Sequence, residues 1–76
     1  MLRLKDLRED YDLTQKEIAS ILNVSQVAYS YYELGKREID INSLIKLAKF
    51  YNTSVDYIVG LTNNKEAYNK RQLPKK

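Results

Sequence analysis

Apolar residues recur along most of the chain at the three- and four-residue intervals that are typical of amphipathic helices. Leu4, Leu7 and Tyr11 follow this spacing and share one face of a helix that we expect over about residues 2–11. Four further segments show the same pattern between residues that commonly start or stop a helix. We expect these helices over about residues 15–22, from Ser25 to about Glu33, from Asp40 to Asn52, and from Ser54 to Gly60. Five short helices in so short a chain predict a compact all-α fold.

Only three residues, Asn23-Val24-Ser25, separate the second and third predicted helices. Asn23 tolerates the left-handed backbone that closes a helix, and the Ser25 hydroxyl can cap the next helix. Because so short a break cannot lay two helices antiparallel, we expect them to cross steeply, as in a helix-turn-helix motif. The small side chain of Ala19 lies where the two helices would approach each other most closely.

The composition excludes several classes of function. The chain has 76 residues with no cysteine and no histidine, which excludes zinc fingers, cysteine nucleophiles and Ser-His-Asp triads. A chain of this length has little room for a substrate cleft, so we expect neither an enzyme nor a cofactor. No apolar stretch approaches the roughly 20 residues of a membrane-spanning helix, and the charged N-terminal residues do not resemble a signal peptide. We therefore expect a cytoplasmic protein without a membrane partner.

The charge is distributed unevenly along the chain. Residues 1–60 carry eight Lys or Arg against nine Asp or Glu, whereas residues 61–76 carry five against one. The folded part is therefore not a uniformly basic surface, and any polyanion must bind to a local patch. We expect a domain over residues 1–61 and a poorly ordered, basic and polar tail over residues 62–76.

Taken together, these motifs resemble those of the lambda-repressor/Cro-like helix-turn-helix regulators, also called the xenobiotic-response-element family. The resemblance covers about residues 2–60. It rests on Leu2-Arg3 with Arg8, on Leu13 to Ala19, on Val24-Ser25-Gln26, on Tyr32 to Glu38, on Leu44 to Lys49 and on Ser54 to Gly60. It implies a sequence-specific regulator of transcription, repressor-like, that binds double-stranded DNA as a homodimer on an inverted repeat. For the dimer we expect contacts from Tyr57 and Leu61, with Ile58 more consistent with the core.

The third predicted helix carries the candidate DNA-reading surface. Helical geometry directs Ala28, Tyr29 and Tyr32 inward. The outward positions are almost free of charge and comprise Gln26, Val27, Ser30, Tyr31 and Leu34. Amide, hydroxyl and apolar groups of this kind read base edges in the major groove, where glutamine pairs with adenine and an aliphatic group contacts a thymine methyl.

The resemblance assigns individual roles to residues of this region. For contacts with bases it implies Gln26, Val27, Tyr31 and Ser30. For contacts with phosphates it implies Gln15, Lys16, Ser25, Lys36 and Arg37, with Ser25 and Ser30 able to serve either partner. It further implies a partly buried structural ion pair between Arg8 and Glu33, which makes Arg8 a poor candidate for DNA contact.

Three positions depart from the family pattern. Asn23 stands in place of a glycine, Ile39 in place of a frequent proline, and Tyr29 in place of a branched aliphatic residue. We expect the turn at Asn23 to survive, because asparagine accepts a left-handed conformation. The Tyr29 hydroxyl needs either a hydrogen-bond partner or a route to solvent.

A second class of function remains open, namely a protein-interaction module of the same fold, such as an antitoxin or adaptor. Its contacts would come from an aromatic surface formed by Tyr31, Tyr51 and Tyr68. The nearly neutral domain favours this alternative, whereas the uncharged outward face of the third helix favours DNA. Weak, salt-labile DNA binding without sequence preference would indicate the interaction module.

Overall fold

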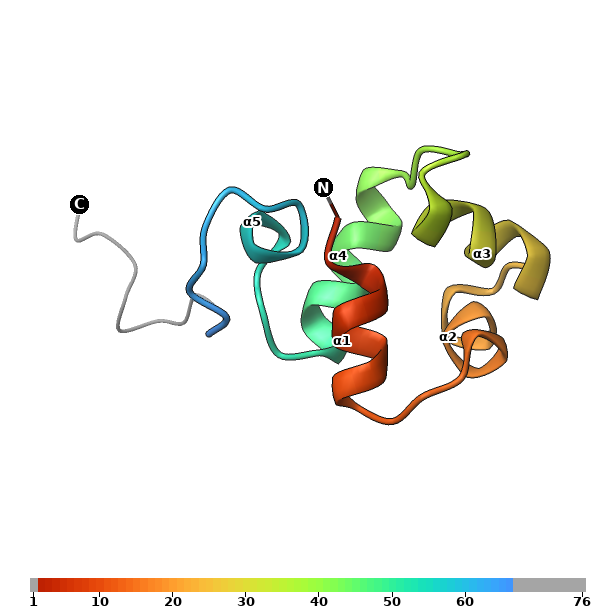
Figure 1. The fold of residues 1–76 in the computed structure, drawn as a ribbon, viewed down its shortest axis with the longest axis horizontal. Coiled ribbons are helices and arrows are strands. Elements are labelled where there is room, and N and C mark those ends of the chain that lie inside the picture. Colours follow the sequence, from red (N-terminus) through yellow and green to blue (C-terminus); the bar gives the residue numbers. More distant parts are fainter. Residues whose placement is uncertain (1, 67–76) are drawn as a thin grey trace.

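The computed structural model describes residues 2–66 and shows five helices and no strand within that range (Figure 1). The helices are α1 (Leu4–Asp10), α2 (Gln15–Leu22), α3 (Gln26–Leu34), α4 (Ile41–Phe50) and α5 (Val55–Ile58). The predicted all-α class is therefore confirmed. In Figure 1, α2 and α3 lie at one end of the molecule and α5 at the other, with α1 and α4 between them.

Side-chain caps set the start of most helices. The Thr14 hydroxyl accepts a hydrogen bond from the Glu17 backbone N–H at 3.1 Å, and the Glu17 carboxylate accepts one from the Thr14 N–H at 2.8 Å. This reciprocal arrangement is the capping box that the sequence predicted for α2. Ser25, Asp40 and Ser54 cap α3, α4 and α5 through a side-chain oxygen that accepts from the backbone N–H three residues further on.

The predicted start of the first helix is wrong by two residues. Helix α1 begins at Leu4, and its N-cap residue Arg3 offers no capping side chain to the helix. The other end of α1 agrees with the sequence, since Asp12 turns the chain with a φ of 58° just after it. Asn23 ends α2 in the left-handed conformation, with a φ of 61°. The turn therefore survives with asparagine in place of glycine, as predicted.

The core joins all five helices around apolar side chains. Its fully buried members are large: Leu4, Leu7, Ile18, Tyr29, Leu47, Tyr51 and Ile58. Ala19 is 2% exposed at the α2–α3 crossing, as its small size predicted. Ala28, which we expected to point inward, is only half-buried. Ile58 is completely buried, which supports its role in the core and argues against a role in a dimer contact.

An unexpected clamp ties the N-terminus to the segment after α5. The Arg3 guanidinium donates to the backbone oxygens of Tyr57 at 2.8 Å and Thr62 at 2.6 Å, and to Asn63 Oδ1 at 2.7 Å. It also lies 4.2 Å from the centre of the Tyr57 ring. The Thr53 hydroxyl donates to the backbone oxygen of Lys65. Residues 62–66 thus contact the domain, while the rest of the expected tail lies outside the described residues.

We expect Arg3→Met to lower the free energy of unfolding by about 1–2 kcal/mol, because three carbonyl-type acceptors lose their charged donor. Urea unfolding followed by circular dichroism measures this change. Lys5→Met is the matched control, since Lys5 is an exposed cation on α1 two residues away. Equal stability of the two variants would show that the clamp contributes nothing.

Candidate nucleic-acid interface

Helices α2 and α3 form the crossing pair of a helix-turn-helix motif. Only the turn from Asn23 to Ser25 separates them, and α3 packs closely on α2. Ser25 occupies the N-cap of α3, where its hydroxyl accepts from the Ala28 N–H at 3.0 Å. Capping uses one lone pair of this hydroxyl, so its O–H remains available as a donor to another group.

The outward face of α3 exposes the side chains that the sequence predicted there. Val27 is 59% exposed, Leu34 65% and Tyr31 38%, and Gln26 is exposed as well. Ser30 differs, since it is half-buried and its hydroxyl donates to the Val27 backbone oxygen at 2.7 Å. Ser30 can therefore still accept a hydrogen bond, but its proton is engaged within the helix.

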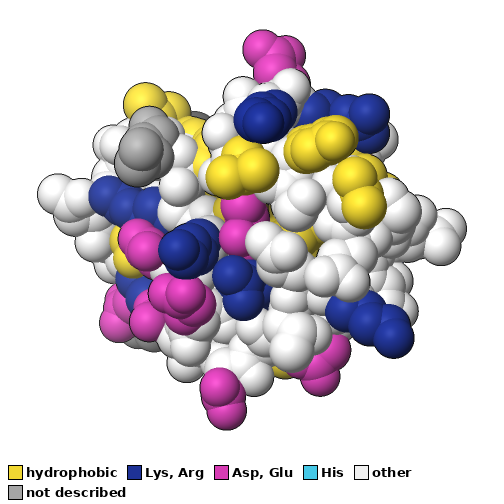
Figure 2. All heavy atoms as spheres, turned by 45° about the vertical axis from the view of Figure 1, so that its right-hand side comes forward, with side chains coloured by type: hydrophobic (Ala, Val, Ile, Leu, Met, Phe, Trp, Pro, Cys, Tyr) yellow, Lys and Arg dark blue, Asp and Glu magenta, His cyan; other side chains and the backbone are white. Residues whose placement is uncertain are grey.

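Cationic side chains border this face. Lys16 on α2 and both Lys36 and Arg37 after α3 are exposed. The Arg37 guanidinium lies 5.9 Å from the centre of the Tyr31 ring, so a predicted phosphate contact adjoins a predicted base contact. Figure 2 shows lysine and arginine side chains beside apolar ones on the side of the molecule that carries α2 and α3. On a domain that is nearly neutral as a whole, these exposed cations are the candidates for local contacts with phosphates.

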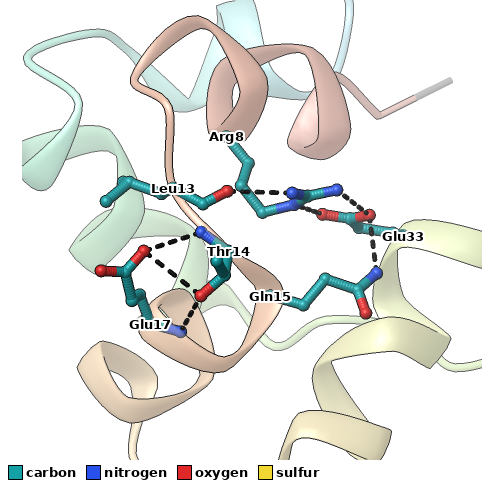
Figure 3. Close-up of polar contacts among 6 residues, drawn as sticks. All are labelled: Arg8, Leu13, Thr14, Gln15, Glu17 and Glu33. Carbon is teal, nitrogen blue, oxygen red and sulfur yellow. Dashed lines mark hydrogen bonds and ion pairs between the residues drawn. The ribbon is translucent and has the colours of Figure 1, made fainter.

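Arg8 and Glu33 meet between α1 and the last turn of α3 (Figure 3). Arg8 Nε lies 2.6 Å from Glu33 Oε2, and the two side chains are only 14% and 5% exposed. A second nitrogen of Arg8 donates to Glu33 Oε1 at 3.3 Å, and a third donates to the Leu13 backbone oxygen at 2.9 Å. The pair therefore fixes α3 to α1 and to the loop that leads into α2.

The same carboxylate holds the side chain of Gln15, which the sequence did not predict. Gln15 Nε2 donates to Glu33 Oε1 at 3.1 Å (Figure 3). An amide nitrogen carries two protons, so one N–H of Gln15 remains for a phosphate. No local pattern signals this bond, because 18 residues separate the two partners.

The surroundings of Glu33 keep it ionised. Burial alone would raise the pKa of its carboxyl, but the hydrogen bond from Arg8, the nearby Tyr29 hydroxyl and the bond from Gln15 outweigh burial and lower it. Burial, and then the Glu33 carboxylate, raise the pKa of Tyr29 far above its usual range. The Tyr29 hydroxyl is buried and, within the described residues, none of its contacts has the geometry of a hydrogen bond. The described residues therefore give this hydroxyl neither the hydrogen-bond partner nor the route to solvent that the sequence called for.

Acid should remove the contribution of Glu33 to stability. Its pKa in the folded chain lies below the ordinary value of 4.5, so the stabilisation is complete above that value and is lost as the pH falls through the lowered pKa. As the pH falls below about 4.5, we expect the urea midpoint to drop more steeply for the wild type than for the double variant R8M/E33M. Parallel pH profiles of the two proteins would contradict this expectation.

The aromatic surface of the alternative hypothesis is not assembled as predicted. Tyr51 is 1% exposed and packs in the core, so it cannot contact a partner. Tyr31 is partly exposed, and Tyr68 lies outside the described residues. A different aromatic pair, Tyr11 and Phe50, is exposed, with ring centres 6.5 Å apart.

Comparison with known proteins agrees with this geometry. A family model described as "Helix-turn-helix" matches residues 4–58. The chain belongs to this helix-turn-helix family, which confirms both the resemblance to lambda-repressor/Cro-like regulators and the fold that it implied. No solved structure matches the chain significantly.

Several curated proteins are similar to the chain. The HTH-type transcriptional regulator ImmR of Bacillus subtilis is 43% identical over 58 residues, which cover 76% of this chain and 46% of ImmR. The uncharacterised HTH-type transcriptional regulator YobD of the same organism is 36% identical over 62 residues, or 82% of this chain and 55% of YobD. The cryptic phage CTXphi transcriptional repressor RstR of Vibrio cholerae is 35% identical over 57 residues, which cover 75% of this chain and 51% of RstR.

These relatives are named as regulators of transcription and not as enzymes, in agreement with the expectation from composition. The chain spans about half the length of the curated relatives that it matches. Among the helices of residues 2–66, none has the length and apolar character needed to cross a membrane.

Proposed function

We propose that this chain is a sequence-specific, repressor-like transcriptional regulator, which acts in the cytoplasm and reads double-stranded DNA with α3 in the major groove. The observation that carries the proposal is the outward face of α3. It presents an exposed amide, an exposed aliphatic group and a phenol, and it lacks charge while cations border it. A face of this kind discriminates bases by hydrogen bonds and methyl contacts, while the cations neutralise phosphates.

In this proposal Gln26 and Val27 read bases at the start of α3, and Tyr31 reads the next turn. Ser30 serves as an acceptor, because its proton is bound within the helix. Phosphate contacts come from the cations Lys16, Lys36 and Arg37 and from the neutral donors Gln15 and Ser25. The name of one relative, the repressor RstR, supports the repressor-like direction.

A homodimer on an inverted repeat completes the proposal. One helix-turn-helix unit covers a small interface, and two units on half-sites about one helical turn apart read twice the sequence. Leu61 is 78% exposed and supports a contact from the segment after α5. Tyr57 is half-buried, with the Arg3 guanidinium over its ring, so only part of the residue is open to a partner.

Selection of bound sequences from randomised duplex DNA tests the function. We expect an enriched inverted repeat, bound with an affinity that falls steeply with salt concentration. Enrichment of a single, non-repeated site would retain DNA reading and contradict the homodimer. The absence of any enriched sequence, with the protein shown to be folded, would favour the protein-interaction module, for which the exposed Tyr11–Phe50 pair is the supporting feature.

Removal of residues 67–76 should reduce the salt dependence of DNA binding and leave the preferred sequence unchanged. This segment contains four Lys or Arg, and each phosphate that a cation neutralises contributes about 0.9 to the slope of log K against log salt. The truncation retains residues 62–66, because they are bonded to the domain. An altered preferred sequence in a repeated selection would show that the tail takes part in base reading.

A further inference from the structure

The bond between Gln15 and Glu33 connects the beginning of α2 to the end of α3. Gln15 is the first residue of α2, and Glu33 lies in the last turn of α3. The amide nitrogen and the carboxylate oxygen are 3.1 Å apart, and the Glu33 side chain is only 5% exposed. An acceptor that is itself rigidly held therefore grips a half-buried glutamine at the edge of the proposed DNA surface.

A glutamine amide has one end that donates and one end that accepts, and rotation by half a turn exchanges them. A DNA phosphate only accepts hydrogen bonds, so only the nitrogen end of Gln15 can bind it. An ionised carboxylate also only accepts. Glu33 therefore selects the orientation in which its own oxygen faces the amide nitrogen, and it uses one of the two protons on that nitrogen.

We propose that Glu33 is a positioning residue for DNA binding, which orients the Gln15 amide so that its second N–H donates to a phosphate. This inference rests on the proposed function. Arg8 is part of the arrangement, because its guanidinium offsets the negative charge that Glu33 would otherwise bring close to the DNA backbone. Through this link, the phosphate contact at α2 is held in fixed register with the base-reading helix that carries Glu33.

Four variants that all carry Arg8→Met isolate this role, because none of them buries an unpaired charge. R8M/E33Q keeps an amide oxygen that can accept from Gln15, whereas R8M/E33M has none. Each is made with and without Gln15→Ala, and folding is checked by thermal unfolding. The probe is the duplex enriched from the random pool.

With Gln15 present, we expect R8M/E33Q to bind this duplex about three- to ten-fold more tightly than R8M/E33M for each half-site, the size of one hydrogen bond. With Gln15→Ala the difference should vanish. The slope of log K against log salt should be the same in all four variants, since they carry the same cations. A shift of α3 that is merely structural would instead weaken binding equally with and without Gln15.

The outcomes separate this inference from the proposed function. If the wild type binds its enriched duplex and the difference between E33Q and E33M persists with Gln15→Ala, the positioning role is overturned and the DNA-binding function stands. The same holds if Gln15→Ala does not weaken binding. If the wild type enriches no sequence, both proposals fall together.

A measurement on the free wild-type protein tests the bond between Gln15 and Glu33 directly, even if the Arg8→Met variants do not fold. We expect the side-chain amide signals of Gln15 in nitrogen–proton NMR spectra to shift as the pH falls and Glu33 takes up a proton. The side-chain amide of Gln26, which is exposed on α3, is the internal control and should not follow that titration. Gln15 signals that behave like those of Gln26 would overturn the proposal.

Discussion

Replacing Arg8 with methionine is expected to lower the free energy of unfolding by about 3 kcal/mol, the lower end of what breaking a buried ion pair costs. The loss arises because Glu33, whose side chain is 5% exposed, would be left without its main charged partner. Gln15 alone does not neutralise the carboxylate. For a domain of this size such a loss is a large part of the total stability. Urea unfolding at pH 7 provides the measurement.

The double variant R8M/E33M is the matched control. Once both charges are replaced by apolar side chains of similar length, no unpaired charge remains, and we expect most of the lost stability to return. A double variant that is as unstable as Arg8→Met alone would show that the shape of the pair matters more than its charge. An Arg8→Met variant as stable as the wild type would contradict the structural role of the pair.

The helices could be predicted from sequence because their signals are local. Thr14 and Glu17 are three residues apart, and a capping box needs nothing beyond that spacing. Asn23 signalled the turn through its own backbone preference. The predicted beginning of α1 is wrong for a related reason: Arg3 provides no local start signal, since its guanidinium binds Tyr57, Thr62 and Asn63 instead of capping the helix.

The contacts that the sequence did not reveal join residues far apart in the chain. Arg3 and Asn63 are separated by 60 positions, and Gln15 and Glu33 by 18. Turns interrupt the chain between the partners of each pair, so no periodic pattern within a single helix brings them together. The surface position predicted for Tyr51 in the alternative hypothesis is wrong for a different reason, because tyrosine is common both in cores and on surfaces. Its burial depends on where α4 packs, which is a property of the whole fold.

The candidate site likewise combines positions that helical spacing predicts with contacts that only the complete fold brings together. The outward positions of α3 follow from helical geometry, so the spacing of Gln26, Val27 and Tyr31 is enough to place them on one face. Spacing does not reveal what supports them. Arg37 over Tyr31 and Glu33 beside Gln15 both depend on how a loop or a second helix returns to α3. The sequence thus predicted which side chains face outward, and the structure adds how Tyr31 and Gln15 are held.

Replacing Gln26 with alanine should therefore weaken binding to the enriched duplex by about 10- to 100-fold for each half-site, the worth of one bidentate contact between a side chain and a base. The preference at one position of each half-site should relax, and an adenine is the base that we expect there. Val27→Ala should cost less, because it removes only an apolar contact with a thymine methyl. A selection repeated with each variant measures both effects.

Asn42→Ala is the matched control for Gln26→Ala, since it also exchanges an exposed amide for a methyl group, but on α4. Its affinity and its preferred sequence should equal those of the wild type. Because Gln26 is neutral, its loss should leave the salt slope unchanged, whereas Lys36→Ala should reduce the slope by about 0.9 for each protomer on the DNA and leave the preferred sequence intact. If Gln26→Ala instead selects the same sequence with unchanged affinity, α3 does not read DNA through this end, and the base contacts must be sought at Tyr31 and beyond.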